Sequence, residues 1–181
     1  TIKLDGNYPV GTGNVALGNT ALDSVTTGSQ NVAIGRDALT SLTGGANNAA
    51  VGSAAMEGIT TGQFNVGLGS SAAGGTTTGE YNVAIGQSAL LSNTTASNNT
   101  AVGGLSLDAN TTGTANTAVG MQSLSNNTTA SHNTAVGYTA GYSNTNQHNA
   151  FVGYQAGMNA TSGGGHAYFG SQAGESTTTG A

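Results

Sequence analysis

The chain repeats a five-residue motif, Asn-x-Ala-aliphatic-Gly, at a regular interval of about 17 residues along nearly its whole length. One interval, between Asn133 and Asn149, is one residue shorter than the others, and His166 replaces Asn in the tenth copy. The other copies begin at Asn14, Asn31, Asn48, Asn65, Asn82, Asn99 and Asn116. A unit this short cannot bury a hydrophobic face alone, so neighbouring copies must stack. Because Gly and Asn recur too often for a helix longer than a turn, the repeat predicts an all-β fold, a β-solenoid of ten coils of about 17 residues.

The composition excludes several functions. Only 5% of the residues are charged and the formal net charge is −5. Lys3 and Arg36 are the only basic residues besides histidine, so no basic patch can neutralise phosphates, and we expect binding neither to nucleic acid nor to anionic membranes. No apolar run approaches the roughly 20 residues of a membrane span. Cysteine is absent, and no Ser-His-carboxylate set or paired carboxylates occur at catalytic spacing. We therefore expect no enzyme activity, cofactor or metal site.

The first and last positions of the motif are the most constant ones. The closing glycine, as in Gly35, Gly86 and Gly120, indicates positive φ or a close approach of neighbouring coils. The opening asparagine, as in Asn31, Asn82 and Asn116, suggests either a side-chain ladder along the stack or a left-handed corner. All six residues are predicted to have structural roles.

The motif also suggests which side chains face inward. The aliphatic residue before the glycine, such as Ile34, is predicted to form the core. The residue before it, such as Ala33, belongs to the opposite face of the strand. That place holds Phe151 and Tyr168 near the C-terminus, so it is predicted to be exposed or interfacial there. A second short strand with an inward apolar residue is predicted around Leu39.

We divide the chain into an N-terminal lead-in, residues 1–10, and one solenoid domain, residues 11–181. From about Tyr138 the coils become rich in aromatic residues. There Leu39 and its equivalents are replaced by Gly141, Gly157 and Gly174, which predicts thinner coils.

The motif resembles the head repeats of YadA-like trimeric autotransporter adhesins. Asn31-Val32-Ala33-Ile34-Gly35 and Asn82-Val83-Ala84-Ile85-Gly86 are the copies that carry this resemblance. A small residue and a leucine follow three and four places after the glycine, as in Ala38-Leu39, and with them the motif is still more similar to arrays in phage tail-fibre proteins. The resemblance covers the chain from Gly11 onward. It implies a left-handed β-roll, three chains packed in parallel about a common axis, and an extracellular place on a virion tail fibre or a bacterial surface. The coil is longer than the YadA-like repeat of about 14 residues, which leaves an intertwined triple β-helix open, and we expect the chain to be a fragment of a longer fibre.

A homotrimer is also favoured by physical reasoning, because a coil with two or three aliphatic residues buries little area alone. The predicted function is therefore a structural and adhesive fibre segment that spaces a tip and binds a host receptor or glycan. An alternative is ice binding by stacked Thr rows, such as those of Thr26-Thr27-Gly28 and its equivalents. A thermal-hysteresis assay separates the two functions.

Four aromatic residues are the candidate glycan or receptor site. Tyr138 and Tyr154 occupy the same coil position, as do Phe151 and Tyr168. Stacked aromatic rings beside Asn and Thr are typical of glycan surfaces, although packing at an interface, where the coil becomes thinner, is the interpretation we favour. His132 and His148 also share a position and should lie about 5 Å apart. We interpret them as surface residues.

Overall fold

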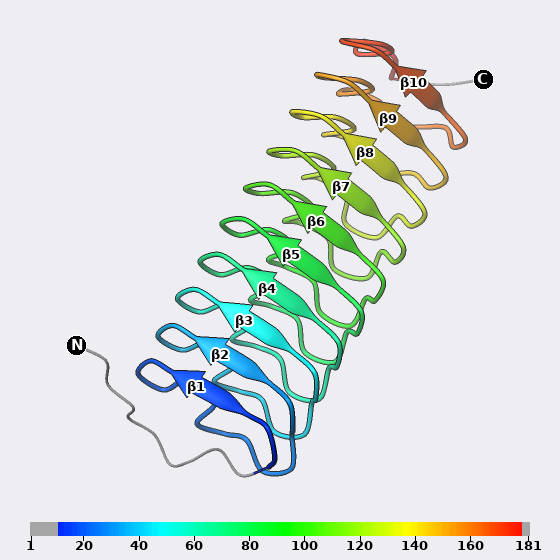
Figure 1. Cartoon of the computed structure of the whole chain (residues 1–181). Helices are drawn as coiled ribbons and strands as arrows, with labels where there is room; N and C mark the ends of the chain where they lie inside the picture. The colour runs from blue at the N-terminus through cyan, green and yellow to red at the C-terminus, as the bar shows by residue number, and fades with distance from the viewer. Residues whose placement is uncertain (1–10, 179–181) are drawn as a thin grey trace.

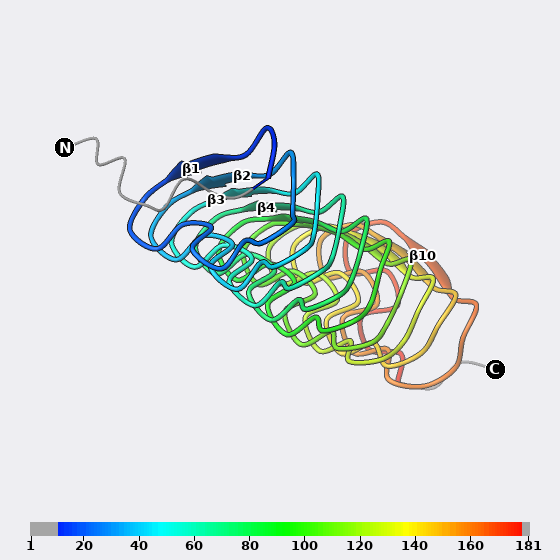
Figure 2. The same cartoon turned by 90° about the horizontal axis from the view of Figure 1, so that it is seen from below.

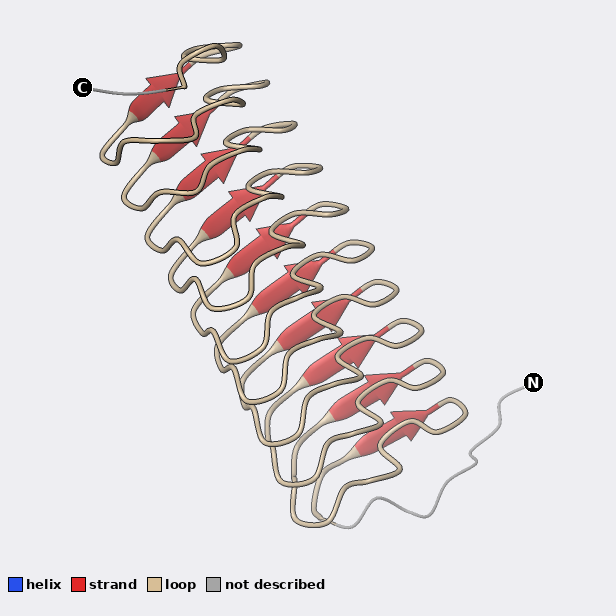
Figure 3. Cartoon of the chain, turned by 180° about the vertical axis from the view of Figure 1, so that it is seen from behind, coloured by secondary structure: helices blue, strands red, loops and turns tan. Residues whose placement is uncertain are grey.

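The computed structural model describes residues 11–178, and the lead-in proposed for residues 1–10 lies outside them. Ten strands form one parallel sheet in chain order, and the described residues contain no helix (Figures 1 and 3). The strands are β1 (Val15–Leu17), β2 (Val32–Ile34), β3 (Ala49–Val51), β4 (Val66–Leu68), β5 (Val83–Ile85), β6 (Thr100–Val102), β7 (Thr117–Val119), β8 (Thr134–Val136), β9 (Ala150–Val152) and β10 (Ala167–Phe169). The prediction of an all-β solenoid is confirmed.

Each coil places one three-residue strand on one side of the rod and turns on the other sides (Figure 2). Equivalent residues of successive coils pair directly, as Val32 does with Ala49 and Val66 does with Val83. The register also continues through the shorter interval, where Thr134 pairs with Ala150. Every row of equivalent residues therefore runs along the rod.

The motif glycines satisfy both conditions that the sequence suggested. Gly86 has φ of 126° and Gly120 has φ of 132°, a left-handed region that disfavours side chains. A Cβ on Gly86 would lie 2.7 Å from the carbonyl carbon of Gly103 in the next coil. Glycine is required here by both the backbone conformation and the spacing of the coils.

The motif asparagines form a buried ladder. Asn82 is fully buried, and its Oδ1 accepts the backbone N–H of Asn99 at 3.0 Å. Its Nδ2 donates to Oδ1 of Asn65 at 3.1 Å and to the carbonyl of Ala96 at 2.9 Å. The left-handed conformation belongs instead to the preceding residue, such as Tyr81 with φ of 56°. The ladder is confirmed, and the left-handed corner at asparagine is wrong.

The predicted inside and outside of the strand are reversed. Ala33 and Ala84 are fully buried, whereas Ile34 and Ile85 are each 36% exposed. The coil interior is narrow because the turn opposite the strand sends Leu39 and its equivalents inward, where they too are fully buried. Only a small residue fits between that side chain and the strand backbone. The aliphatic row expected in the core therefore faces outward.

The second strand predicted around Leu39 is a turn. Leu39 adopts a left-handed conformation with φ of 53°, and its N–H donates to the carbonyl of Ala55 in the next coil. Its side chain nevertheless points inward, as the sequence predicted. A left-handed position explains why glycine replaces leucine here so readily in the last coils.

The expected thinning of the last coils does not occur around Phe151. Its ring is fully buried, and a Cβ on either Gly141 or Gly157 would lie closer than 3.0 Å to it. Phenylalanine on the strand thus occupies the space that leucine fills from the turn in other coils. Met56 and Gly67 show a similar exchange, since a Cβ on Gly67 would lie 2.7 Å from Cγ of Met56. Core volume is kept nearly constant by paired changes.

Candidate interaction surfaces

The outward side of the ten strands forms a surface that we call the sheet face. It consists of the first and third residues of every strand, and no described segment covers it (Figure 1). β2, β4 and β5 place only aliphatic residues there, and β6 to β8 combine a threonine with a valine. The exposed members include Val15 at 52%, Val51 at 39% and Phe169 at 68%. The strands thus present their larger aliphatic residues to the outside, while the leucines of the turns fill the interior.

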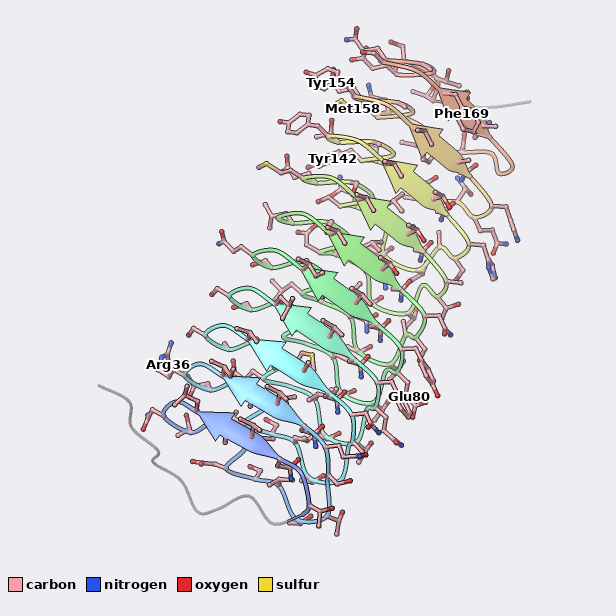
Figure 4. The ribbon with its side chains drawn as sticks, in the orientation of Figure 1. Arg36, Glu80, Tyr142, Tyr154, Met158 and Phe169 are labelled. Carbon is pink, nitrogen blue, oxygen red and sulfur yellow. The ribbon has the colours of Figure 1, made fainter. Side chains whose placement is uncertain are left out.

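Two further rows flank the sheet face. The amino edge contains the residue two places before each strand, and the carboxyl edge contains the residue two places after it. The amino edge is Gly13, Gln30, Asn47, Phe64, Tyr81, Asn98, Ala115, His132, His148 and Gly165. The carboxyl edge is Asn19, Arg36, Ser53, Ser70, Gln87, Gly104, Met121, Tyr138, Tyr154 and Ser171. Figure 4 shows the edges on opposite sides of the strands, with Arg36 and Tyr154 near one and Glu80, the neighbour of Tyr81, near the other.

Charge is nearly absent from this whole side of the rod. The sheet face contains no charged residue, and Arg36 is the only one on the two edges, histidine excepted. Arg36 is paired with Asp37 at 2.5 Å. The other described carboxylates lie outside these rows, at Asp23, Glu57, Glu80, Asp108 and Glu175. The sheet face and its two edges could therefore contact the same surface of another copy of the chain without bringing like charges together.

Aromatic rings stack in pairs on both edges. On the amino edge, Phe64 stacks on Tyr81 with centroids 5.0 Å apart, and His132 stacks on His148 at 5.2 Å. The histidine distance confirms the prediction. The Phe64 and Tyr81 pair was missed, although both residues precede a motif asparagine by one place.

On the carboxyl edge, Tyr138 stacks on Tyr154 with centroids 5.6 Å apart, as their shared coil position implied. Tyr138 is 44% exposed and Tyr154 is 50% exposed. Met121 continues the row, and Tyr142 and Met158 lie near Tyr154 on the same side of the rod (Figure 4). Met121, Tyr138 and Tyr154 make this the most apolar part of the carboxyl edge, and Tyr142 and Met158 lie beyond it.

The four residues of the candidate glycan site do not form one surface. Phe151 stacks on Tyr168 at 5.8 Å, but Phe151 is fully buried and Tyr168 is half-buried against the core. Placing Phe151 in a binding site was therefore wrong. Tyr138 and Tyr154 are accessible, yet their rings are within 12° of parallel and face one another along the rod. Between the two rings no aromatic face is free for a sugar to stack on, which does not favour a glycan cradle.

In the Thr-Thr-Gly segments and their equivalents, the first threonine donates its hydroxyl proton to the backbone of the next coil. Thr26 Oγ1 donates to the carbonyl of Thr43 at 3.1 Å, and Thr60 and Thr94 donate in the same way to the next coil. These bonds tie successive coils together. A hydroxyl that donates to the next coil's backbone has no proton left to donate to ice, so this threonine row supports the ice-binding alternative less than a row of free hydroxyls would.

The short coil, residues 133–148, has one residue fewer than the others, and its hydrogen bonding is incomplete. In the coil before it, the carbonyl of Ala130 accepts from Nδ2 of Asn116 at 2.9 Å and of Asn127 at 3.0 Å. The residue equivalent to Ala130 is missing from the short coil. Nδ2 of Asn133 and Oδ1 of Asn127 are both buried without a partner. A shallow hollow of about 250 Å³ lies beside them, lined by Thr129, Ala130, Thr145, Asn146 and Gln147.

Other classes of site are not evident in residues 11–178. They contain no group of three or more His, Cys, Asp or Glu side chains placed to hold a metal ion. They also contain no helix long and apolar enough to cross a membrane. Comparison of the chain with protein-family models, curated proteins and solved structures gave no match.

Proposed function

We propose that this chain is a spacer segment of an extracellular fibre in which three copies pack in parallel through the sheet face. Such a fibre would belong to a phage tail or a bacterial surface. The observation that carries the proposal is the uncovered, uncharged and aliphatic sheet face. The left-handed coil and the three-chain packing, both implied by the resemblance, are part of the proposal.

The distribution of side chains supports self-association. Leu68 and Ile85 are each 36% exposed, and the sheet face repeats such a residue at every coil spacing. Burial of apolar area contributes roughly 25 cal/mol per Å². The surface is long, narrow and neutral, so three copies around one axis can cover it without bringing like charges together. A single rod leaves this area in water.

A spacing role follows from the regularity of the rod. The ten coils, at about 4.8 Å each, extend roughly 48 Å. Each coil is fixed to the next by strand pairing and by the asparagine ladder. A rod of this kind holds the segments attached at its two ends at a fixed distance from one another, and this role needs no catalytic group.

Multi-angle light scattering of the full chain tests the proposal. The expected mass is three times the 17.4 kDa of one chain. Leu68→Asp or Ile85→Asp should yield a monomer with an unchanged circular dichroism spectrum, because each aspartate would be buried near two identical charges. Thr61→Asp, an exposed change away from the sheet face, is the matched control and should remain trimeric. A wild-type monomer at micromolar concentration would overturn the proposal.

A further inference from the structure

We infer that the two edges of neighbouring chains meet in this trimer, so that Tyr138 and Tyr154 of one copy contact His132 and His148 of the next. The inference rests on the proposed trimer and goes beyond it by naming the residues of the contact. It also gives the stacked aromatic pairs of the last coils a role that neither a glycan site nor the core supplies.

The geometry follows from symmetry. Three parallel sheets facing a common axis form a triangular prism, and at each corner the carboxyl edge of one chain meets the amino edge of the next. Rotation about an axis along the rod leaves heights unchanged. Residues that flank the same strand must therefore meet across a corner. β8 is flanked by His132 and Tyr138, and β9 is flanked by His148 and Tyr154.

The contact area requires the edges to take part. Three residues at about 3.3 Å each, over ten coils at about 4.8 Å, give the sheet face a flat area of only about 480 Å². A stable interface usually buries about 800 Å² on each partner. Including both edges widens each coil's contribution to about seven residues, which raises the area to about 1,100 Å².

At several strands a large residue on one edge faces a small one on the other, whereas β2, with Gln30 and Arg36, and β5, with Tyr81 and Gln87, have long side chains on both edges. The large Phe64 flanks the same strand as the small Ser70, and the large Met121 flanks the same strand as Ala115. At β6 both flanking residues, Asn98 and Gly104, are small enough to meet. Only β8 and β9 place aromatic rings on both edges. At these two corners a tyrosine would lie opposite an imidazole, and its phenolic hydroxyl can hydrogen-bond to a ring nitrogen.

Cross-linking between introduced cysteines tests the contact, because the chain has none of its own. In the double variant His132→Cys, Tyr138→Cys, a short bis-maleimide should join three chains into a covalent trimer on a denaturing gel. The two cysteines of one chain cannot be bridged, since about six residues of extended backbone separate them by about 20 Å. Ser53→Cys combined with His132→Cys is the control, because those positions differ by about five coils, or about 24 Å in height.

The outcomes separate the inference from the function on which it rests. Covalent trimers in the matched pair alone support the contact. A trimer by light scattering that gives no cross-linked species, or equal cross-linking in the mismatched control, refutes the edge contact and leaves the trimer standing. A covalent dimer that goes no further refutes the three-fold arrangement. A monomer by light scattering refutes both.

Discussion

Inserting one alanine between Asn146 and Gln147 should stabilise the rod. The new residue would occupy the place of Ala130 in the preceding coil and restore the full length of the coil that begins at Asn133. Its carbonyl could then accept from Nδ2 of Asn133, which is buried without a partner. Nδ2 of Asn144, which now donates to the carbonyl of Asn146 at 2.7 Å, could turn to Oδ1 of Asn127.

The size of the effect follows from the two orphaned atoms. A buried polar atom without a partner costs about 1–3 kcal/mol, so repairing two would gain roughly 2–6 kcal/mol. Ordering one more residue costs about 1–2 kcal/mol. The net gain is about 0–5 kcal/mol, with a midpoint of about 2.5 kcal/mol, and one kcal/mol shifts the melting temperature of a chain of this size by roughly 2–4 °C.

Thermal unfolding followed by circular dichroism measures the shift, and hydrogen exchange locates it. Because repeat rods can unfold in parts, protection of the backbone N–H of His148, which donates to the carbonyl of Ser131, is the local measure. Inserting alanine between Ala130 and Ser131 is the control and should destabilise, since it makes a coil of full length one residue too long. If the first insertion leaves the melting temperature and the protection unchanged or lowers them, the reasoning about the missing residue is wrong.

Three further predictions rest on the contacts inside the coils and on the proposed function. Phe151→Ala should destabilise the rod by about 3–5 kcal/mol in urea unfolding. Adding Gly157→Leu should recover part of this loss, because it recreates the alanine and leucine pair of earlier coils. If the side chains at positions 151 and 157 do not fill the same part of the core, the losses from the two substitutions would simply add. Asn82→Ala should cost about 1–3 kcal/mol by leaving the buried N–H of Asn99 unpaired, whereas the carbonyl of Ala96 keeps its bond from Nδ2 of Asn93, and a loss near zero would contradict the ladder. Nanolitre osmometry should detect no thermal hysteresis, and a clear freezing gap would favour ice binding over the fibre.

The sequence predicted those features that depend only on the repeat. Equal spacing of His132 and His148 was enough to place them about one strand spacing apart, since equivalent residues of stacked coils must lie side by side. The motif glycines were equally predictable, because only a backbone constraint keeps Gly35 and Gly86 the same in every coil. The stack of Phe64 on Tyr81 carried the same signal and could have been found by the same argument.

The direction in which the strand faces could not be read from the repeat. Alternation shows that Ala33 and Ile34 lie on opposite faces, but it does not show which face is inside. That choice depends on the width of the coil, which is set by a turn whose left-handed leucines have no sequence signature. Placing Phe151 in a binding site failed for a related reason. Its ring is buried because glycines on the turn make room for it, and such compensation appears only when both segments are seen together.

The reversal of inside and outside changes the physical problem that the chain must solve. Its interior combines a buried asparagine ladder, closely packed alanines of the strands and the leucines that the turns send inward. The aliphatic residues of the strands themselves, such as Ile34 and Ile85, lie on the sheet face. A single chain therefore pairs most of its backbone groups but leaves one row of aliphatic side chains partly in water. The proposed trimer would bury that row, and the absence of charge from the sheet face is what favours an identical copy as the partner.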